Sequence, residues 1–229
     1  MKEALRRIDQ EIGRFATGNW ITVTGEFLAL VGICLFWMHQ DWPAVILLTL
    51  SFLTDRFDGS VSRYHESLRR AQGLSLLTEK EEEALGWWST MNHRGETHLG
   101  KWLDPLVDKI RFIGLLWVLA QDIVPSEIIL NLTTMAILLT IVRPVLRWLD
   151  LGDGASNIFG KIKAHVEVVS ITVLVFTTRP LFGEINALQD VPLMNYFTFT
   201  LFSGCLILAL ISFTTHAYSG WLAYKAKHP

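Results

Sequence analysis

The sequence is poor in the features that hold small secreted domains together or bind nucleic acids. Its 229 residues include only two cysteines, Cys34 and Cys205, and each lies inside an apolar run, where a thiol packs as a small hydrophobic group. A fold held together by disulfides is therefore excluded. The 20 Lys and Arg residues do not outnumber the 22 Asp and Glu residues, so no positive surplus is available to neutralise phosphates. Nucleic acid is therefore excluded as a partner.

Charged residues are also scarce over long stretches of the chain. Apolar residues make up 51% of the sequence, and the mean hydropathy is +0.34. At ~20 residues per crossing, these stretches are typical of membrane-spanning helices and leave no room for a large soluble domain. They are Trp20–Met38, Pro43–Thr54 (continuing to Arg63), Ile110–Gln121, Ile128–Val142, Val166–Thr178 and Leu193–Phe213. We therefore expect an all-α membrane protein with six transmembrane helices.

The distribution of positive charge predicts how these helices are oriented. With the N-terminus inside, all but Arg179 of the 20 Lys and Arg residues fall on the inner side. Because positive residues are retained in the cytoplasm, we expect both termini and any chemistry to be cytoplasmic.

The segment before the first span predicts a helix that lies on the membrane surface. Within residues 1–17, apolar residues recur at spacings of three and four, at Leu5, Ile8, Ile12 and Phe15. This spacing favours an amphipathic helix suited to an anionic leaflet. The alternative is a basic extension that only orients the first span.

Four aspartates stand where the second span ends and the third begins. Asp55 and Asp58 are three residues apart, and Asp104 and Asp108 are four apart, so each pair lies on one face of a helix. Two neighbouring antiparallel helices would bring the four carboxylates together, and such oxygens are ligands for Mg²⁺, Mn²⁺ or Ca²⁺. The alternative is four interfacial acids, each solvated or paired with a nearby Lys or Arg.

These aspartates belong to a longer pattern. The sequence reads Asp55-x-x-Asp58-Gly59-x-x-Ser62-Arg63 and then Gly100-x-x-x-Asp104-x-x-x-Asp108. It resembles the signature of the CDP-alcohol phosphatidyltransferase family, D-x-x-D-G-x-x-A-R followed after a short gap by G-x-x-x-D-x-x-x-D. Seven of the eight fixed positions match, and Ser62 stands in place of Ala. The six spans, the cytoplasmic termini and the N-terminal surface helix also fit that family. The resemblance covers nearly the whole chain and implies a single membrane domain over residues 1–229.

The resemblance implies an enzyme that transfers a phosphatidyl group from CDP-diacylglycerol to an alcohol and releases CMP. It implies two divalent ions, Mg²⁺ or Mn²⁺, with Asp108 also acting as the general base. The implied metal ligands are Asp55, Asp58, Asp104 and Asp108. The implied donor-binding residues are Gly59, Arg63 and Gly100, together with Asn19 and Thr22 from a weaker N-x-x-T match. Family members tend to be dimers, so a homodimer is expected, in the inner membrane if the cell is bacterial.

A group of cations on the inner side bears on the identity of the acceptor. The group consists of Arg143, Arg147, Lys161 and Lys163. The stretch Gly160–Ala164 resembles the G-K-x-K-T element of phosphatidylglycerophosphate synthases, and a cationic pocket suits a phosphorylated acceptor such as glycerol 3-phosphate. The stretch Leu103–Lys109 resembles cardiolipin synthases, so phosphatidylglycerol remains an alternative, as does inositol phosphate. Orienting charge alone would also account for the four cations.

Residues 64–99 separate the two halves of the signature by far more than is usual in the family. The capping-box pattern that begins at Thr78 predicts a short helix through Trp88, followed by a polar loop. His93 and His98 in that loop have no accompanying cysteine, so we expect no zinc site there. Two roles stay open for this cytoplasmic insertion, shaping access for the acceptor and binding a partner.

Two other classes of protein could use the same aspartates. A divalent-cation or proton-coupled transporter would hold its ions there, but the sequence has no internal repeat, and the acids lie at one membrane face. A catalytically silent family member would bind the nucleotide-lipid or scaffold a partner. The presence of all four aspartates argues against that reading.

Overall fold

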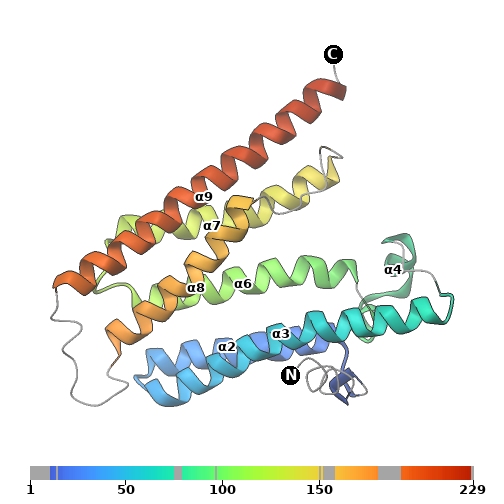
Figure 1. The fold of residues 1–229 in the computed structure, drawn as a ribbon, viewed down its shortest axis with the longest axis horizontal. Helices are drawn as coiled ribbons and strands as arrows, with labels where there is room; N and C mark the ends of the chain where they lie inside the picture. The colour runs from blue at the N-terminus through green and yellow to red at the C-terminus, as the bar shows by residue number, and fades with distance from the viewer. Residues whose placement is uncertain are drawn as a thin grey trace. The chain divides into compact units, whose positions relative to one another are not determined.

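The computed structural model describes residues 11–13, 15–74, 79–95, 97–149, 151, 158–179 and 192–227. Every regular element among these residues is an α-helix, as predicted (Figure 1). The chain divides into two compact units, Met1–Asp108 and Lys109–Pro229, and helix α6 (His98–Leu119) carries the boundary between them. Most of the predicted N-terminal amphipathic helix, residues 1–10 and Arg14, lies outside the described residues. The single-domain assignment stays a prediction.

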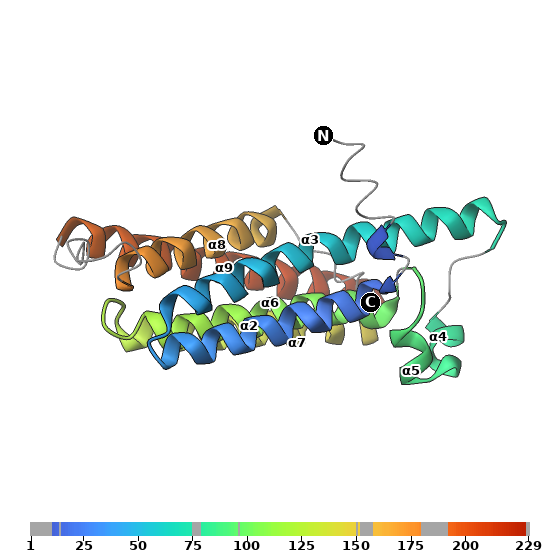
Figure 2. The same cartoon turned by 90° about the horizontal axis from the view of Figure 1, so that it is seen from below.

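Helices α2 (Gly18–Trp37) and α3 (Asp41–Ala71) form an antiparallel pair in the first unit, joined by a short turn (Figure 2). Small residues are buried along the pair, and close packing of small residues is how apolar helices associate in membranes. They are Gly18, Gly25, Ala29 and Gly32 of α2 and Ala44 and Ser51 of α3. The two backbones approach so closely that a Cβ added to Gly32 would lie 3.3 Å from the backbone carbonyl oxygen of Ala44.

Helix α3 is longer than the predicted span, which ended at Arg63. Its 31 residues correspond to about 46 Å at 1.5 Å per residue, so it runs past the start of α2 (Figure 2). Residues 64–71 of this extension belong to the predicted insertion and end with Arg69 and Arg70 in the last helical turn, where positive charge complements the helix dipole. The insertion therefore begins as a continuation of a helix and not as a loop.

The rest of the insertion contains two short helices, α4 (Glu79–Leu85) and α5 (Trp87–Met91). The prediction of one helix through Trp88 is wrong, because Gly86 has a φ of +74°, a left-handed conformation that ends α4 and turns the chain before α5. Thr78, the predicted cap, lies outside the described residues.

The second unit contains the end of α6 with helices α7 (Ser126–Trp148), α8 (Ile158–Thr178) and α9 (Pro192–Lys227), and α9 packs against both α7 and α8. Trp117 Nε1 donates a hydrogen bond to Thr133 Oγ1 (3.0 Å) and joins α6 to α7. Helix α9 continues well beyond the predicted limit at Phe213, and near its end Lys225 Nζ lies 5.5 Å from the centre of the Trp221 ring.

Three helices in the described part of the chain are long and apolar enough to cross a membrane. They are Gly18–Trp37, Ser126–Leu146 and Pro192–Lys227. The other three predicted spans coincide with α3, α6 and α8, but each of these helices carries several charged residues along its length. The apolar helices are those of an integral membrane protein.

Candidate active site

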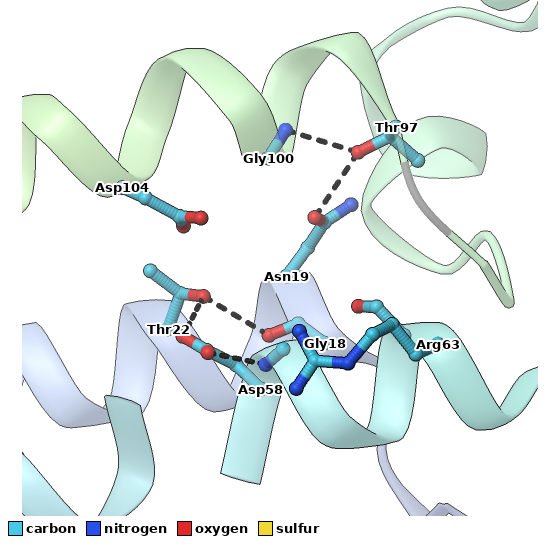
Figure 3. A pocket seen from close by; sticks show the side chains of 10 residues that line it. Gly18, Asn19, Thr22, Asp58, Arg63, Thr97, Gly100 and Asp104 are labelled. Carbon is cyan, nitrogen blue, oxygen red and sulfur yellow. Dashed lines mark hydrogen bonds between the residues drawn. The ribbon is translucent and has the colours of Figure 1, made fainter. Parts of the chain in front are cut away.

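A pocket of about 200 Å³ lies within the first unit, between α2, α3 and the start of α6 (Figure 3). Both halves of the aspartate signature contribute to it, although the insertion separates them in sequence. It is lined by Gly18, Asn19, Thr22, Asp58, Gly59, Ser62, Arg63, Thr97, Gly100 and Asp104. All of the predicted donor-binding residues thus line the pocket. The antiparallel packing of α2 and α3 brings the N-x-x-T residues of α2 next to the first half of the aspartate signature on α3.

Asp58 is the buried carboxylate of the pocket, with a relative exposure of 7%. Thr22 Oγ1 donates to Asp58 Oδ2 (2.7 Å), and the backbone N–H of Gly59 donates to Asp58 Oδ1 (2.5 Å). A buried carboxylate is costly unless it is paired or hydrogen-bonded, so these two bonds both stabilise Asp58 and fix its orientation. Thr22 therefore has a defined task in this structure, which is to hold Asp58.

Asp104 lies on α6 and lines the same pocket opposite Thr22 and Asp58 (Figure 3). Asp55 and Asp108 are exposed and do not line the pocket. The structure therefore brings two of the four predicted metal ligands to one cavity.

The chemistry of these two donors fits a divalent ion, because hard cations prefer carboxylate oxygens. Across the described ranges, no three or more His, Cys, Asp or Glu side chains are grouped closely enough to hold a metal ion. The four-aspartate metal site therefore stays a prediction.

Arg63 gives the pocket a positive rim. Its side chain is exposed, and a Cβ added to Gly59 would lie 3.3 Å from Arg63 Nη1, so the guanidinium lies directly beside the Gly59 backbone. A planar guanidinium next to an open backbone position is suited to a phosphate group.

Asn19 connects the pocket to the insertion. Its Nδ2 donates to the backbone carbonyl of Thr90 (2.9 Å), and its Oδ1 accepts a hydrogen bond from Thr97 Oγ1 (3.2 Å). Thr97 Oγ1 in turn accepts from Gly100 N (3.0 Å) and caps the start of α6. A Cβ on Gly100 would lie 2.8 Å from Asn19 Oδ1, which leaves no room for a larger residue.

Sequence analysis missed Thr97 and Glu82, which both act at the start of α6. Glu82, 7% exposed, accepts a hydrogen bond from Leu99 N at Oε1 (2.9 Å). Thr97 could have been recognised as an N-cap three residues before Gly100. Glu82 carries no such local pattern, because it is 17 residues away from its partner.

His93 belongs to the contact between the insertion and the end of α3. Its Nε2 lies 3.4 Å from Arg69 Nη1. Burial and the nearby Arg69 charge lower the pKa of His93 below its ordinary value of 6.5. A neutral imidazole can accept a hydrogen bond from Arg69, whereas a charged one would repel it. The side chain of His98 is outside the described residues.

The predicted acceptor cations lie in the second unit, where Lys163 is buried. Lys163 Nζ is 2.5 Å from Glu167 Oε1, and Lys109 Nζ is 2.9 Å from Glu167 Oε2. Glu167 was missed because it lies in the predicted Val166–Thr178 span, although its i,i+4 spacing from Lys163 could have indicated a pair. Lys161 is exposed on α8, and Arg143 and Arg147 lie on α7 with side chains outside the described residues.

With these elements placed, comparison with known proteins identifies the family. The model of the CDP-alcohol phosphatidyltransferase family matches residues 15–68 and 92–202. The chain belongs to this family. Neither the curated proteins nor the solved structures gave a match. Members of the family are phosphotransferases for substituted phosphate groups, and this phosphatidyltransferase is an enzyme of that class.

The part of this phosphatidyltransferase that the family model leaves unmatched between its two segments, residues 69–91, falls inside the predicted insertion. It contains α4 and α5, and hence Glu82, Thr90 and Met91. Their bonds to Leu99 N, Asn19 and Thr17 attach the unmatched segment to the starts of α6 and α2, two of the three helices around the pocket. This segment does not line the pocket itself but supports the two helix ends that do.

The one departure from the signature, Ser62, also has a structural counterpart. A Cβ on Gly18 would lie 2.0 Å from Ser62 Oγ and 3.0 Å from the Asp58 carbonyl oxygen. The hydroxyl of Ser62 thus fills the space that a side chain at position 18 would need. Serine fits at position 62 because its neighbour at position 18 is glycine.

Proposed function

We propose that the protein transfers a phosphatidyl group from CDP-diacylglycerol to an alcohol, with glycerol 3-phosphate as the acceptor and CMP as the product. The observation that supports this most directly is the pocket that joins Asp58, Gly59 and Arg63 to Gly100 and Asp104 across the insertion. In this reaction the acceptor oxygen bonds to the β-phosphorus of the donor as the bond from that phosphorus to the CMP oxygen breaks. Phosphatidylglycerol and inositol phosphate are the alternative acceptors.

The proposed metal ligands are the four signature aspartates, for two Mg²⁺ or Mn²⁺ ions. Asp58 and Asp104 already face one pocket, and Thr22 holds Asp58 in place. The bound ions would neutralise the charge that develops on the pyrophosphate. Asp108 would accept the proton of the attacking hydroxyl.

Arg63 and the two signature glycines are proposed to bind the donor. The guanidinium of Arg63 can form paired hydrogen bonds to a phosphate, while Gly59 and Gly100 let the nucleotide approach the backbone. Asn19 shapes the same wall through Thr97.

The acceptor phosphate is proposed to bind at the cations of the second unit, Arg143, Arg147, Lys161 and Lys163. Support comes from the Lys163–Glu167–Lys109 cluster, in which two ammonium groups share one carboxylate. The surplus positive charge of such a cluster attracts an anion.

We further propose that α3, α6 and α8 cross the membrane together with α2, α7 and α9. Both termini and the active site would then be cytoplasmic, and the enzyme would act as a homodimer. The charge distribution supports this arrangement, because Arg179 alone would face the other side among the Lys and Arg residues.

The reaction is tested by CMP release from the purified protein in the presence of CDP-diacylglycerol and Mg²⁺ or Mn²⁺. Separate reactions contain glycerol 3-phosphate, phosphatidylglycerol, inositol 1-phosphate, serine or no acceptor. Release with glycerol 3-phosphate is expected to stop with EDTA and to fall by on the order of 100-fold or more in Asp104→Asn. Asp122→Asn, at an exposed carboxylate in the turn after α6, is the matched control and should retain activity.

The acceptor that supports CMP release identifies the substrate. Release with a different alcohol would refute glycerol 3-phosphate but keep the phosphatidyl transfer. No release with any acceptor, from protein that remains folded, would refute the transfer itself.

A further inference from the structure

The insertion exposes large apolar side chains, which its contacts with the pocket helices leave uncovered. Trp87 and Trp88 are 58% and 66% exposed, and Leu85 just before them is 44% exposed. An indole has a large apolar ring and one N–H donor, so tryptophan is enriched where acyl chains meet lipid headgroups. Two adjacent exposed tryptophans on a five-residue helix therefore indicate a surface that contacts lipid.

The first turn of α2 fixes where these tryptophans lie. The ring centroids of Trp88 and Trp20 are 6.1 Å apart, and Trp20 Nε1 donates to Asn92 Oδ1 (3.0 Å). Thr17 Oγ1 and Asn19 Nδ2 donate to the backbone carbonyls at the end of α5, at 2.7 Å and 2.9 Å. Because Thr17 and Asn19 are themselves buried, α5 is attached to α2 by hydrogen bonds that exclude water.

Helix α2 is one of the helices long and apolar enough to cross a membrane, and it begins at Gly18. The first turn of a spanning helix lies near the headgroup region, where the hydrocarbon layer ends. A segment bonded to that turn lies at the same depth, so the surface of α5 is continuous with the membrane-embedded surface of α2.

We propose that α5 is a membrane-surface element whose Trp87 and Trp88 insert among the lipid headgroups beside the start of α2. The occupant of this surface is the lipid–water interface and not a second protein, because the surface continues that of a spanning helix. Helix α4, which precedes it, is rich in glutamate and would not be attracted to anionic lipid. Burial of the aromatic rings therefore drives the contact, and zwitterionic lipid is sufficient for it.

The test measures the depth of position 87 in the full chain, reconstituted in phosphatidylcholine nanodiscs. After Cys34→Ala and Cys205→Ala, a spin label is attached at Trp87→Cys, and its collisions with oxygen and with a water-soluble nickel complex are measured. A label at Leu30→Cys, exposed midway along α2, gives the bilayer reference, and a label at Gln72→Cys, exposed after α3, gives the aqueous one.

We expect the label at position 87 to favour oxygen over nickel, with a value between the two references. A value equal to that at Gln72 would overturn the proposal. Protection from both reagents would also overturn it, because it would show that protein, a second copy included, covers α5. The measurement needs no turnover, so its result is independent of the proposed reaction.

A second measurement avoids the cysteine substitution in case that variant does not fold. Native tryptophan fluorescence is recorded in lipid brominated near the headgroup, for the wild type and for the Trp87→Phe/Trp88→Phe variant. The difference between the two emission spectra comes from Trp87 and Trp88, and we expect the brominated lipid to quench this difference strongly. An unquenched difference spectrum would overturn the proposal.

Discussion

At the scale of single residues, Gly18 shows how tightly the pocket is built. Its backbone lies against Ser62 and the carbonyl of Asp58, and the same turn of α3 carries the buried carboxylate. A larger residue at position 18 would therefore displace both Ser62 and the turn that carries Asp58. The effect can be separated from helix propensity, because the nearest obstructing atom, the Ser62 hydroxyl oxygen, can itself be removed by mutation.

Gly18→Ala is expected to destabilise the protein by about 1–3 kcal/mol, the usual effect of an overpacked site. Ser62→Ala alone should change stability little, and adding it to Gly18→Ala should restore part of the loss. The restoration stays partial because the Asp58 carbonyl oxygen would still lie 3.0 Å from the new Cβ. The measurement is the thermal unfolding midpoint of each variant in detergent.

Gly204→Ala is the matched control for this series. A Cβ there meets nothing within 4 Å, so alanine should stabilise α9 slightly through its better helix propensity. Equal midpoints for Gly18→Ala and Gly204→Ala would contradict the packing argument.

The residues that the sequence identified share one property, which is a fixed local spacing. Asp58, Gly59 and Arg63 follow one another on a single helix, and Asp104 follows Gly100 in the same way, so their pattern survives the insertion. Thr97 could have been found from its spacing to Gly100, but Glu82 escaped notice because its role depends on how the insertion folds back on α6. No spacing rule connects residues whose contact is made by tertiary structure.

At the scale of whole elements, a buried charge cluster joins α6 to α8. Lys163 and Glu167 have side-chain exposures of 4% and 7%, and Lys109 completes the cluster from α6. Removing the carboxylate leaves the buried ammonium group of Lys163 and the partly buried one of Lys109 without their shared counter-charge. Glu167→Gln is therefore expected to destabilise the protein by about 3–5 kcal/mol.

The compensating change is Lys163→Met, which removes one of the two ammonium groups and keeps an apolar stem of similar length. The Lys163→Met/Glu167→Gln variant should recover much of the loss in the unfolding midpoint. Glu127→Gln, at an exposed carboxylate in the first turn of α7, serves as control and should cost far less. A midpoint for Glu167→Gln as high as that of the control would show that the cluster does not stabilise the fold.

The insertion should respond to acid through His93. Because the folded pKa of His93 is lowered below 6.5, the unfolded insertion binds a proton more readily than the folded one. The contribution of this contact to stability is thus fully present above about pH 6.5. It is lost as the pH falls from there through the lower pKa of the folded state. Hydrogen exchange of residues 87–95 is expected to accelerate between about pH 7.5 and pH 5.5, after correction for intrinsic rates.

His93→Gln should weaken that acid response, because glutamine can accept from Arg69 but does not titrate. His165 is an exposed histidine on α8, in the second unit and outside the insertion. His165→Gln is therefore the control and should leave the response of residues 87–95 in place. An unchanged response in His93→Gln would contradict the assignment.

The sequence located the cores of the long helices but not their ends. Apolar runs mark where a helix is buried in lipid or protein, whereas the polar end of α3, as far as Ala71, and that of α9, as far as Lys227, have no such pattern. The break at Gly86 was missed for a related reason. The capping box marks where a helix starts, but a single glycine does not show which φ it adopts.

At the scale of the whole molecule, the helices that carry the signature aspartates and the buried charge pair are not among those apolar enough to be identified as spans. Helices α3, α6 and α8 hold the aspartates and the Lys163–Glu167 pair, and those charges lower their apolar character. Helices α2, α7 and α9 carry few charges and are long and apolar enough to cross a membrane. The charged residues that the proposed function requires thus lower the hydropathy of the helices that carry them.

The number of crossings can be decided from the positions of the two ends. Six crossings place both termini on the same side of the membrane, whereas crossings by α2, α7 and α9 alone place them on opposite sides. We expect a fluorescent protein fused to either terminus to be bright in a bacterial host, because it folds only in the cytoplasm. Alkaline phosphatase fused after Arg179 should be active, since it requires the opposite compartment. A bright N-terminal fusion combined with an active C-terminal phosphatase fusion would refute the six-span arrangement, and with it the cytoplasmic position of the charged ends of α3 and α6.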